Sequence, residues 1–277
     1  MEERIKELIT IGREFMKGSE AKEKGGMPEY QTDQELKKQQ PPLYKAPMGG
    51  EVIELPTNYK DLDLKNDILE ILYKRKSSRV YTQETMTLLE LSYLLWATQG
   101  VKEIRGNNYA TLRTVACGGA RHEFECYISV RDVEGLESGY YHYMPDKHAV
   151  EVVQLMDKEV MFQEVHKSLW GQTWACKANV TFFYSIIPYR AEWRYGISSH
   201  RVALIDSGHI TQNLYVACAS ANLGTCAIAA VETELCNQMF HLDGEEEFIF
   251  YAATAGKISE ANKKEEDAFY AFLKEEE

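Results

Sequence analysis

A short run of positive charge stands out in a chain that is otherwise strongly acidic. Residues 74–79 read KRKSSR, which places four cations and two hydroxyls side by side. A guanidinium binds phosphate with two parallel hydrogen bonds, an ammonium adds a point charge, and a serine hydroxyl donates once more. The run therefore predicts a phosphate-binding site. The alternative is a solvated helix end, where cations are favoured by the helix dipole.

A second candidate is the small-residue stretch TVACGGARH at residues 114–122. Small side chains let a backbone approach a flat or bulky ligand closely. The sequence contains no G-x-x-x-x-G-K-[ST] pattern, and no G-x-G-x-x-G pattern follows a strand, so the common nucleotide-binding motifs are absent. The alternative for this stretch is a tight turn that leads into the strand at residue 124.

A third stretch is dense in groups that can move protons. It holds Arg194 and Tyr195, followed by His200, Asp206 and His209. General acid–base catalysis needs such groups beside a reacting centre. The spacing matches neither a Ser–His–Asp triad nor a thiol–His–acid triad, and each histidine could equally be structural. No C-x-x-C pair occurs among the six cysteines, and we predict no metal site.

The composition limits the class of protein. With 31 Lys and Arg against 43 Asp and Glu, the net charge is −12, so binding to nucleic acid or to an anionic membrane is not expected. The hydrophobic fraction of 44% is that of a globular protein and excludes a disordered or fibrous chain. The charged N-terminus lacks a signal-peptide core, and the cysteines suit buried reduced thiols, so we predict a cytoplasmic protein. The uncharged stretch 210–231 contains Asn, Gln and Gly and is expected to be a buried helix and turn.

Periodicity places these candidates on helices and strands. Thr87 and Glu90 form a capping-box pattern at the start of a helix that ends near Gly100. The pattern predicts further helices at residues 66–75, 158–169, 200–222 and 232–240, with a helical tail from 259. It predicts strands at residues 124–131, 139–143, 148–153, 179–187, 225–230 and 247–254, of which 139–143 and 148–153 form a hairpin.

These elements predict an α+β fold, a three-layer sandwich with a mixed, mostly antiparallel sheet between helices. Five of the seven prolines lie at or before Pro56, in a region where one amphipathic helix with Ile5, Leu8, Ile9 and Phe15 gives way to a polar, non-periodic stretch. We therefore expect residues 1–60 to form an N-terminal helix and extended arm on the surface of a body at residues 61–277.

The order of segments resembles the nitroreductase superfamily of FMN enzymes, and within it the azoline-oxidase branch of thiazole- and oxazole-forming dehydrogenases. The polar arm with QPPLY at residues 40–44 also resembles that branch. The matching stretches are RKSSRVY at 75–81, LSYLLWATQGV at 91–101, LRTVACGGARH at 112–122, GYYHY at 139–143, RYG at 194–196, DSGHITQNL at 206–214, ANLGTCAIAA at 221–230 and ATAG at 253–256.

The resemblance implies a homodimer with FMN at the subunit interface and the helix from residue 210 in the dimer core. The residues it implies as cofactor contacts are Arg75, Lys76, Ser77 and Arg79 for the phosphate and ribityl chain, Lys257 for the phosphate, Gln172 for the ring or ribityl group, Ala229 and Ala230 for the N5 edge, and Ala116, Cys117 and Gly118 from the partner subunit.

Two departures from the family pattern bear on the chemistry. The azoline oxidases carry a Lys-Tyr pair proposed for proton transfer, and the matching residues here are Arg194 and Tyr195. Because arginine stays protonated, Tyr195 is the expected acid or base and Arg194 an electrostatic clamp. Ala116 and Cys117 stand where the branch commonly has Pro-Ser.

The resemblance implies hydride transfer between FMN and a small-molecule or peptide substrate. The reaction is either azoline dehydrogenation or reduction of a nitro compound, quinone or enone, with NAD(P)H as a candidate electron donor. A flavin-binding carrier or sensor without turnover, and a structural dimer without flavin, are the alternatives.

Overall fold

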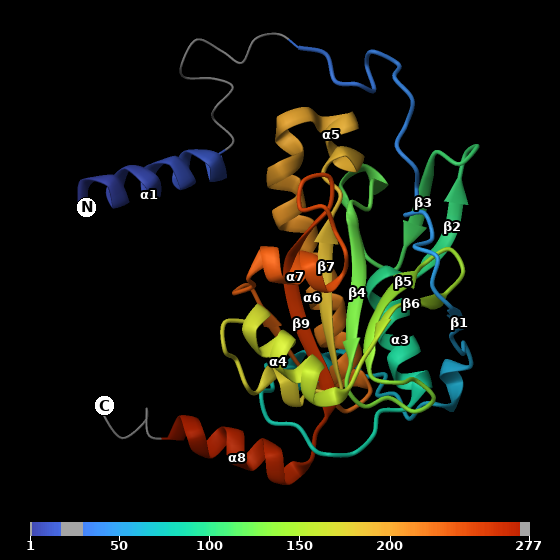
Figure 1. Ribbon diagram of the computed structural model, residues 1–277, viewed down its shortest axis with the longest axis vertical. Helices are drawn as coiled ribbons and strands as arrows, with labels where there is room; N and C mark the ends of the chain where they lie inside the picture. The colour runs from blue at the N-terminus through green and yellow to red at the C-terminus, as the bar shows by residue number, and fades with distance from the viewer. Residues whose placement is uncertain (1, 18–29, 272–277) are drawn as a thin grey trace.

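The computed structural model describes residues 2–17 and 30–271. Its centre is a seven-stranded sheet in the order β1-β6-β5-β4-β7-β9-β8 (Figure 1), and every neighbouring pair in that sheet is antiparallel. The strands are β1 (Val52–Glu54), β4 (Phe124–Val130), β5 (Gly139–Met144), β6 (Ala149–Leu155), β7 (Val180–Ile186), β8 (Leu223–Ile228) and β9 (Phe248–Lys257).

Helices cover both faces of this sheet. One core contains side chains of α3 (Leu88–Gln99) and α6 (Ser199–Ser220), and the other contains side chains of α4 (Lys158–Ser168) and α7 (Thr233–Met239). Alternate residues of β4 serve the two cores, since Cys126 and Ile128 lie in the first and Tyr127 in the second. The predicted α+β three-layer sandwich is therefore confirmed, with a central strand buried on both faces.

Most predicted elements occur close to their expected positions. The capping box at the start of α3 is formed, since the Thr87 side chain accepts from the Glu90 backbone N–H while the Glu90 carboxylate accepts from the Thr87 N–H. The predicted helix at 66–75 is α2 (Ile68–Lys74), which begins at the N-cap Asp67. The tail is α8 (Glu260–Ala271), and the N-terminal helix is α1 (Glu2–Lys17).

The structure adds elements that periodicity did not predict. Strands β2 (Val101–Arg105) and β3 (Ala110–Arg113) form a separate two-stranded sheet, and a short helix, α5 (Tyr189–Tyr195), precedes α6. Short stretches of 3-10 helix are the remaining elements, η2 (Tyr59–Asp61), η3 (Gly118–Ala120), η4 (Ala175–Lys177) and η5 (Gly196–Ser198).

The predicted arm is only partly described, because residues 18–29 lie outside the described residues. Apolar side chains of α1 are exposed, with Leu8 at 58%. Residues 52–54 of the arm form β1 and pair with β6 at the edge of the main sheet. The division of the chain at residue 60 stays a prediction.

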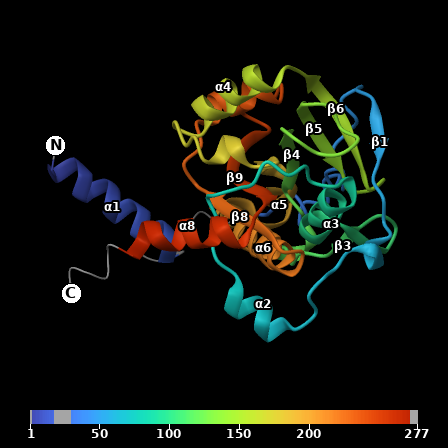
Figure 2. The ribbon, with the colours of Figure 1, turned by 90° about the horizontal axis from the view of Figure 1, so that it is seen from below.

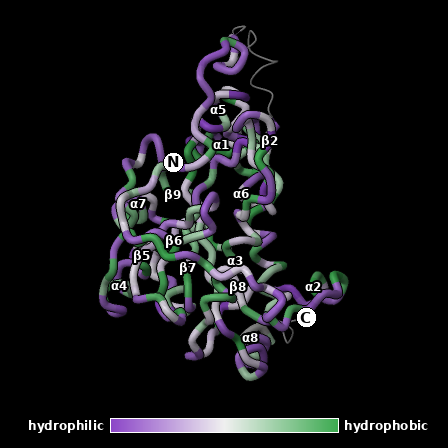
Figure 3. Tube along the Cα trace, turned by 90° about the vertical axis from the view of Figure 1, so that its right-hand side faces the viewer, coloured by the Kyte–Doolittle hydropathy of each residue, from purple (hydrophilic) through white to green (hydrophobic). Residues whose placement is uncertain are grey.

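Helices α2 and α8 lie at the same end of the molecule as β8 and the C-terminal half of α6 (Figure 2). Several apolar side chains of α2 point to solvent, among them Leu69 and Tyr73, and Figure 3 shows green colour along this helix. On α6, Leu204 and Ile205 are about half exposed. None of the helices in the described residues is long and apolar enough to span a lipid bilayer.

Candidate cofactor and active site

The basic segment, residues 74–79, leaves the end of α2 and runs to the edge strand β8. Asp67 starts α2 by accepting from the backbone N–H groups of Leu69 and Glu70, and the helix ends at Arg75. The Ser78 N–H then donates to the Thr225 carbonyl over 2.9 Å, which attaches the segment to β8. A helix on one side and a strand on the other therefore fix the positions of the cations.

A pocket of about 300 Å³ opens beside this segment. Its lining carries five cations and a single carboxylate, that of Glu260. A concentration of positive charge in a small cavity favours a multiply charged anion such as a phosphate. The charged or polar lining residues are Lys65, Lys74, Arg75, Lys76, Ser78, Tyr215, Asn222, Thr225, Glu260 and Lys263.

Tyr215 of α6 connects the basic segment to the end of β8. Its hydroxyl lies 2.8 Å from the Ser77 hydroxyl and accepts a hydrogen bond from the Ala227 N–H over 3.0 Å. The Arg75 guanidinium lies 5.2 Å from the centre of its ring, which is a cation–π contact. Sequence reasoning did not identify Tyr215, although it is the one tyrosine of the uncharged stretch 210–231.

The loop after α4 reaches the same segment. The Arg79 guanidinium lies 5.5 Å from the centre of the Trp174 ring. Gln172, two residues earlier, donates from its side chain to the Leu169 carbonyl and is half-buried. Ala229 and Ala230 directly follow β8 and are exposed.

Acidic residues of α8 face the basic segment. The Lys76 ammonium pairs with Asp267 at 2.7 Å, and the Arg79 backbone N–H donates to the Glu266 carboxylate. These contacts place two carboxylates of α8 next to residues that the resemblance assigns to the phosphate and ribityl chain.

The positions of Lys257 and Lys263 differ from the expectation that Lys257 contacts the phosphate. The ammonium of Lys257, which the resemblance assigned to the phosphate, instead pairs with Glu90 at 2.6 Å, and Lys257 is not among the residues that line the pocket. Lys263 of α8 does line the pocket. Sequence reasoning missed Lys263 because the charged tail showed no motif.

The small-residue stretch forms a loop against the start of α6. The Gly118 N–H donates to Asp206 over 2.8 Å. Gly119 has a φ of +58°, and a β-carbon there would lie 2.4 Å from the Tyr195 hydroxyl and 2.9 Å from Nε of Arg194. A larger residue with this left-handed backbone would be strained and would displace both side chains, so the glycine lets Arg194 and Tyr195 lie against the loop. The structure therefore brings Arg194 and Tyr195 together with the predicted loop.

Beneath this loop lie three groups that could bind a metal. The Cys117 thiol donates to Glu123 at 3.2 Å, and ligand atoms of Cys117, Glu123 and Asp206 lie within 4.8 Å of one another. Burial raises the pKa of the Glu123 carboxyl to about 7, and the Asp206 charge adds to the rise. Burial also raises the pKa of the Cys117 thiol, so the sulfur is protonated and a poor nucleophile. The expectation of no metal stays a prediction.

Each histidine of the third stretch contacts a carboxylate. His200 pairs with Glu192 at 2.7 Å, and His209 lies 3.3 Å from Asp206. Each imidazole therefore has a carboxylate of its own, as structural histidines often do.

Burial lowers the pKa of His122, the last residue of the small-residue stretch, to about 3. The charge of Arg113 lowers this pKa further, so the imidazole of His122 is neutral.

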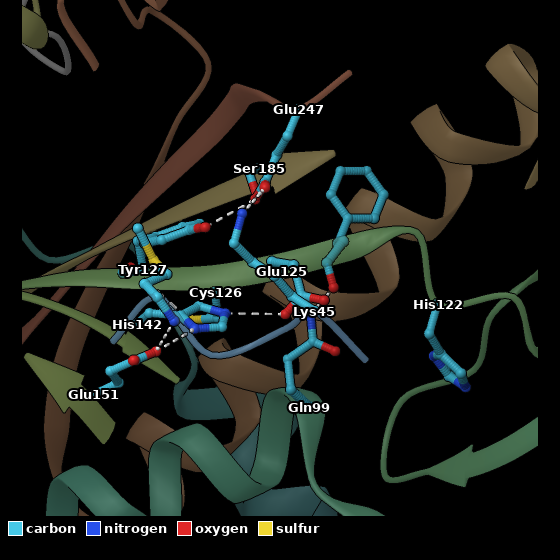
Figure 4. Close-up of polar contacts among 12 residues, drawn as sticks. Lys45, Gln99, His122, Glu125, Cys126, Tyr127, His142, Glu151, Ser185 and Glu247 are labelled. Carbon is cyan, nitrogen blue, oxygen red and sulfur yellow. Dashed lines mark hydrogen bonds and ion pairs between the residues drawn. The ribbon is translucent and has the colours of Figure 1, made fainter. Parts of the chain in front are cut away.

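A buried network of charges supports the sheet behind the loop (Figure 4). Glu125 of β4 contacts Arg190 at 2.6 Å and His142 at 3.2 Å. Burial alone would raise the pKa of Glu125, but the Arg190 charge and the His142 hydrogen bond lower it. The carboxylate is therefore ionised and held inside the sheet by its partners.

Two further carboxylates attach the arm to this sheet. Glu151 of β6 accepts from the backbone N–H groups of residues 48–50, and Glu247 pairs with Lys45. Residues 45–50 belong to the predicted arm, so the arm is fixed to the body by buried polar contacts. These contacts have no direct part in the candidate site.

The two halves of the candidate site are separated along α6. Asp206 contacts the small-residue loop, and Tyr215 contacts the basic segment. The two residues are more than two helical turns apart on the same helix. One subunit therefore presents the loop and the pocket at different points of α6.

Comparison with known proteins places the chain in a family. The nitroreductase family model matches residues 72–257. A Methanocaldococcus jannaschii protein described as a nitroreductase is 34% identical over 161 residues, 58% of this chain and 77% of that protein. The trifolitoxin-processing protein TfxB of Rhizobium leguminosarum bv. trifolii is 27% identical over 161 residues, 56% of this chain and 43% of that protein.

Solved structures share the fold. A protein from Ralstonia eutropha described as a nitroreductase superposes with a TM-score of 0.61 and 23% identity, covering 80% of this chain and 96% of that one. A chain of the Escherichia coli microcin synthetase McbBCD complex gives a TM-score of 0.56 and 18% identity over 75% of this chain and 79% of its own. Since the family model covers well over half of the residues, the chain belongs to the nitroreductase family.

Proposed function

We propose that this chain is an FMN-dependent oxidoreductase that works as a homodimer. The single observation that carries the proposal is the pocket with five cations, which joins the predicted phosphate-binding segment to α6 and β8. Its donors suit a phosphate monoester, because guanidinium, ammonium and hydroxyl groups all donate to phosphate oxygens. Bound FMN would supply hydride exchange at N5 of its ring.

The proposal gives parts to residues that line the pocket and to residues beside it. Arg75, Lys76 and Lys263 bind the phosphate, with Lys263 in the place first given to Lys257. Ser77 and Tyr215, whose hydroxyls contact each other, orient the ribityl chain. Arg79 keeps its proposed contact with the ribityl chain, and the proposed contacts of the ring are Gln172, Ala229 and Ala230.

A second subunit completes the site in this proposal. The loop of Ala116, Cys117 and Gly118 reaches the ring from the partner subunit. Within one subunit this loop contacts α6 more than two helical turns away from the pocket, so it is too far along the helix to serve its own subunit's pocket. The exposed Leu204 and Ile205 on α6 supply apolar surface for that contact. The loop also brings its neighbours Arg194 and Tyr195 to the substrate.

Proton movement is assigned to the pair beside the loop. Tyr195 moves the proton that accompanies hydride transfer, and Arg194 stabilises negative charge that develops on the substrate. The guanidinium of Arg194 lies 5.4 Å from the centre of the Tyr195 ring, so the two side chains can act on one substrate group.

The substrate in this proposal is a small molecule or a peptide. The resemblance to azoline oxidases favours a peptide and dehydrogenation. Similarity to the M. jannaschii protein, which is described as a nitroreductase, favours reduction. NAD(P)H is the donor that we propose for that direction.

The test of FMN binding is the absorbance of the purified protein and its titration with FMN. We expect a yellow protein with flavin bands and a loss of most bound FMN in Arg75→Gln. The control is Arg105→Gln, because Arg105 is exposed on the β2–β3 hairpin, where it pairs with Glu103 at 3.8 Å. A colourless wild-type protein that does not bind added FMN contradicts the proposal.

The direction of the reaction is tested by anaerobic stopped-flow with the FMN-loaded protein. Mixing with NADPH, NADH or an azoline-containing peptide shows which donor bleaches the flavin. Bleaching by a nicotinamide supports a reductase, and bleaching by the peptide supports a dehydrogenase. A protein that binds FMN but is bleached by none of them, and whose Tyr195→Phe variant behaves identically, is a carrier or sensor.

A further inference from the structure

Two arginines lie close together beside the proposed substrate position. Arg121 donates from Nε to the Gly119 carbonyl over 3.0 Å and from Nη2 to the Tyr109 carbonyl over 2.9 Å. Its guanidinium lies 4.9 Å from the centre of the Tyr109 ring. Arg194 donates to the Tyr109 hydroxyl over 2.6 Å. Tyr109, directly before β3, therefore connects both guanidiniums.

Neither positive charge is neutralised by a carboxylate within residues 2–17 and 30–271. The partners of the two guanidiniums are two backbone carbonyls, a phenol and aromatic rings. Glu192, on the same helix as Arg194, pairs with His200 instead. Arg121 is only 4% exposed, and burial and the neighbouring Arg194 charge both lower its pKa. Two adjacent cations without a counter-ion are stabilised by a bound anion.

The phenol of Tyr109 has a hydrogen left for such an anion. Its oxygen accepts from Arg194 and from Nε2 of Gln34 over 3.0 Å, so both contacts use the oxygen as acceptor. The hydroxyl proton therefore remains available to donate. Tyr109 is 40% exposed, so a ligand can reach it.

The cluster also touches the proposed reacting centre. Arg194 and the Tyr195 hydroxyl both lie against Gly119, the residue whose carbonyl accepts from Arg121. We infer that Arg194 and Tyr109 form an anion subsite that binds a carboxylate of the substrate and holds it beside Tyr195, with the buried charge of Arg121 acting from behind Tyr109. A planar carboxylate accepts two parallel hydrogen bonds from a guanidinium, which a neutral group of the same size does not. This inference rests on the proposed function and narrows its substrates to carboxylates.

The first test measures binding without turnover. Isothermal titration calorimetry of the full chain, FMN-loaded where it binds FMN, compares benzoate with benzamide, which has the same shape without the charge. We expect benzoate to bind at least about tenfold more tightly, as charge-assisted hydrogen bonds predict. Arg194→Gln and Tyr109→Phe should remove most of that difference, and Arg194→Lys should restore part of it. The control is Lys102→Gln, which removes an exposed cation from the β2–β3 hairpin. This variant should keep the wild-type preference for benzoate over benzamide.

The second test measures discrimination between two acceptors with the same reacting group. The ratio of kcat/KM for 4-nitrobenzoate to that for 4-nitrobenzyl alcohol cancels any general loss of catalysis in the variants. We expect the wild type to favour the carboxylate through a lower KM, and Arg194→Gln to bring the ratio to about one, a change of about tenfold.

The outcomes separate this inference from the proposed function. FMN binding and turnover of the neutral acceptor without any carboxylate preference would overturn the subsite alone. Benzoate binding that depends on Arg194 in a protein that binds no FMN would support the subsite and contradict the proposed function. Equal binding of benzoate and benzamide by the wild type, or an equal loss in Lys102→Gln, overturns the inference.

Discussion

The carboxylate of Glu266 accepts a hydrogen bond from the backbone N–H of Arg79 over 2.8 Å. Glu266 is only 7% exposed, so α8 holds a carboxylate against the segment that we propose binds a phosphate. Its neighbour Asp267 pairs with Lys76 in the same region. The acidic side of α8 therefore competes with a phosphate for the positive charge of the pocket.

Removing the charge of Glu266 should strengthen FMN binding. In Glu266→Gln the amide keeps the size of the side chain and its acceptor, while the repulsion with the phosphate is lost. We expect the Kd for FMN, measured by fluorescence quenching, to fall about threefold to tenfold, as loss of about 1 kcal/mol of repulsion predicts. Glu265→Gln on the exposed side of α8 is the control. Weaker binding in Glu266→Gln would instead mean that this carboxylate orients the segment.

Of the two lysines considered as phosphate ligands, Lys263 and Lys257, the pocket favours Lys263. Lys263 lines the pocket and pairs there with Glu260 at 2.6 Å, whereas Lys257 lies outside the lining and pairs with Glu90. We expect Lys263→Met to raise the Kd for FMN about tenfold, because a charge-assisted hydrogen bond is lost. Lys257→Met should lower the free energy of unfolding with a smaller effect on that Kd, since it removes the cation that pairs with Glu90. Titration and urea unfolding of both variants check this, and the reverse order would restore Lys257 to the site.

The capping box of α3 should contribute measurably to stability. In Thr87→Ala the Glu90 N–H loses its acceptor, and we expect the free energy of unfolding to fall by about 1 kcal/mol. Ser198 is a matched control, because it is the N-cap of α6 but makes no side-chain capping hydrogen bond. Urea unfolding should show little change in Ser198→Ala. Equal losses in both variants would contradict the role of the hydrogen bond.

The buried Glu123 should make stability depend on pH. Burial, with the Asp206 charge, raises its pKa in the fold to about 7, so the folded state binds the proton more tightly than the unfolded state. The contribution of Glu123 to the free energy of unfolding is fully present below its pKa in the unfolded state, which is about 4.3. This contribution is lost as the pH rises through its raised pKa in the folded state. The amide of Glu123→Gln does not titrate, so this variant does not lose that stability. The Tm of Glu123→Gln minus the Tm of the wild type should therefore increase as the pH rises from about 4 to about 7. Thermal melts test this, with the exposed Glu234→Gln as control, and a constant difference across pH would contradict it.

The exposed apolar residues of α6 should determine the oligomeric state. A glutamate at Ile205 would place charge in the proposed dimer interface. We therefore expect Ile205→Glu to elute as a monomer in size-exclusion chromatography with light scattering, with FMN lost at the same time. The control is Val160→Glu on α4, whose helix covers the opposite face of the sheet and whose side chain is similarly exposed. A dimer that survives Ile205→Glu argues against α6 as the contact.

The sequence by itself determined the features that depend on neighbouring residues. The KRKSSR run is a local cluster of charge, the capping box needs residues only three positions apart, and the alternation of β4 follows from the geometry of one strand. The order of these segments was also enough to indicate the family. Short elements without strong periodicity, such as the β2–β3 hairpin and α5, were missed because local propensity there is weak.

Only the tertiary structure decided which distant residues complete the site. Lys263 and Tyr215 reach the basic segment because α6, β8 and α8 come together at one end of the sheet, and Lys257 is directed to Glu90 by the same packing. Tyr109 meets Arg194 across 85 positions of the chain. Such contacts are set by strand register and helix packing, which depend on the whole hydrophobic core and leave no local pattern in the sequence.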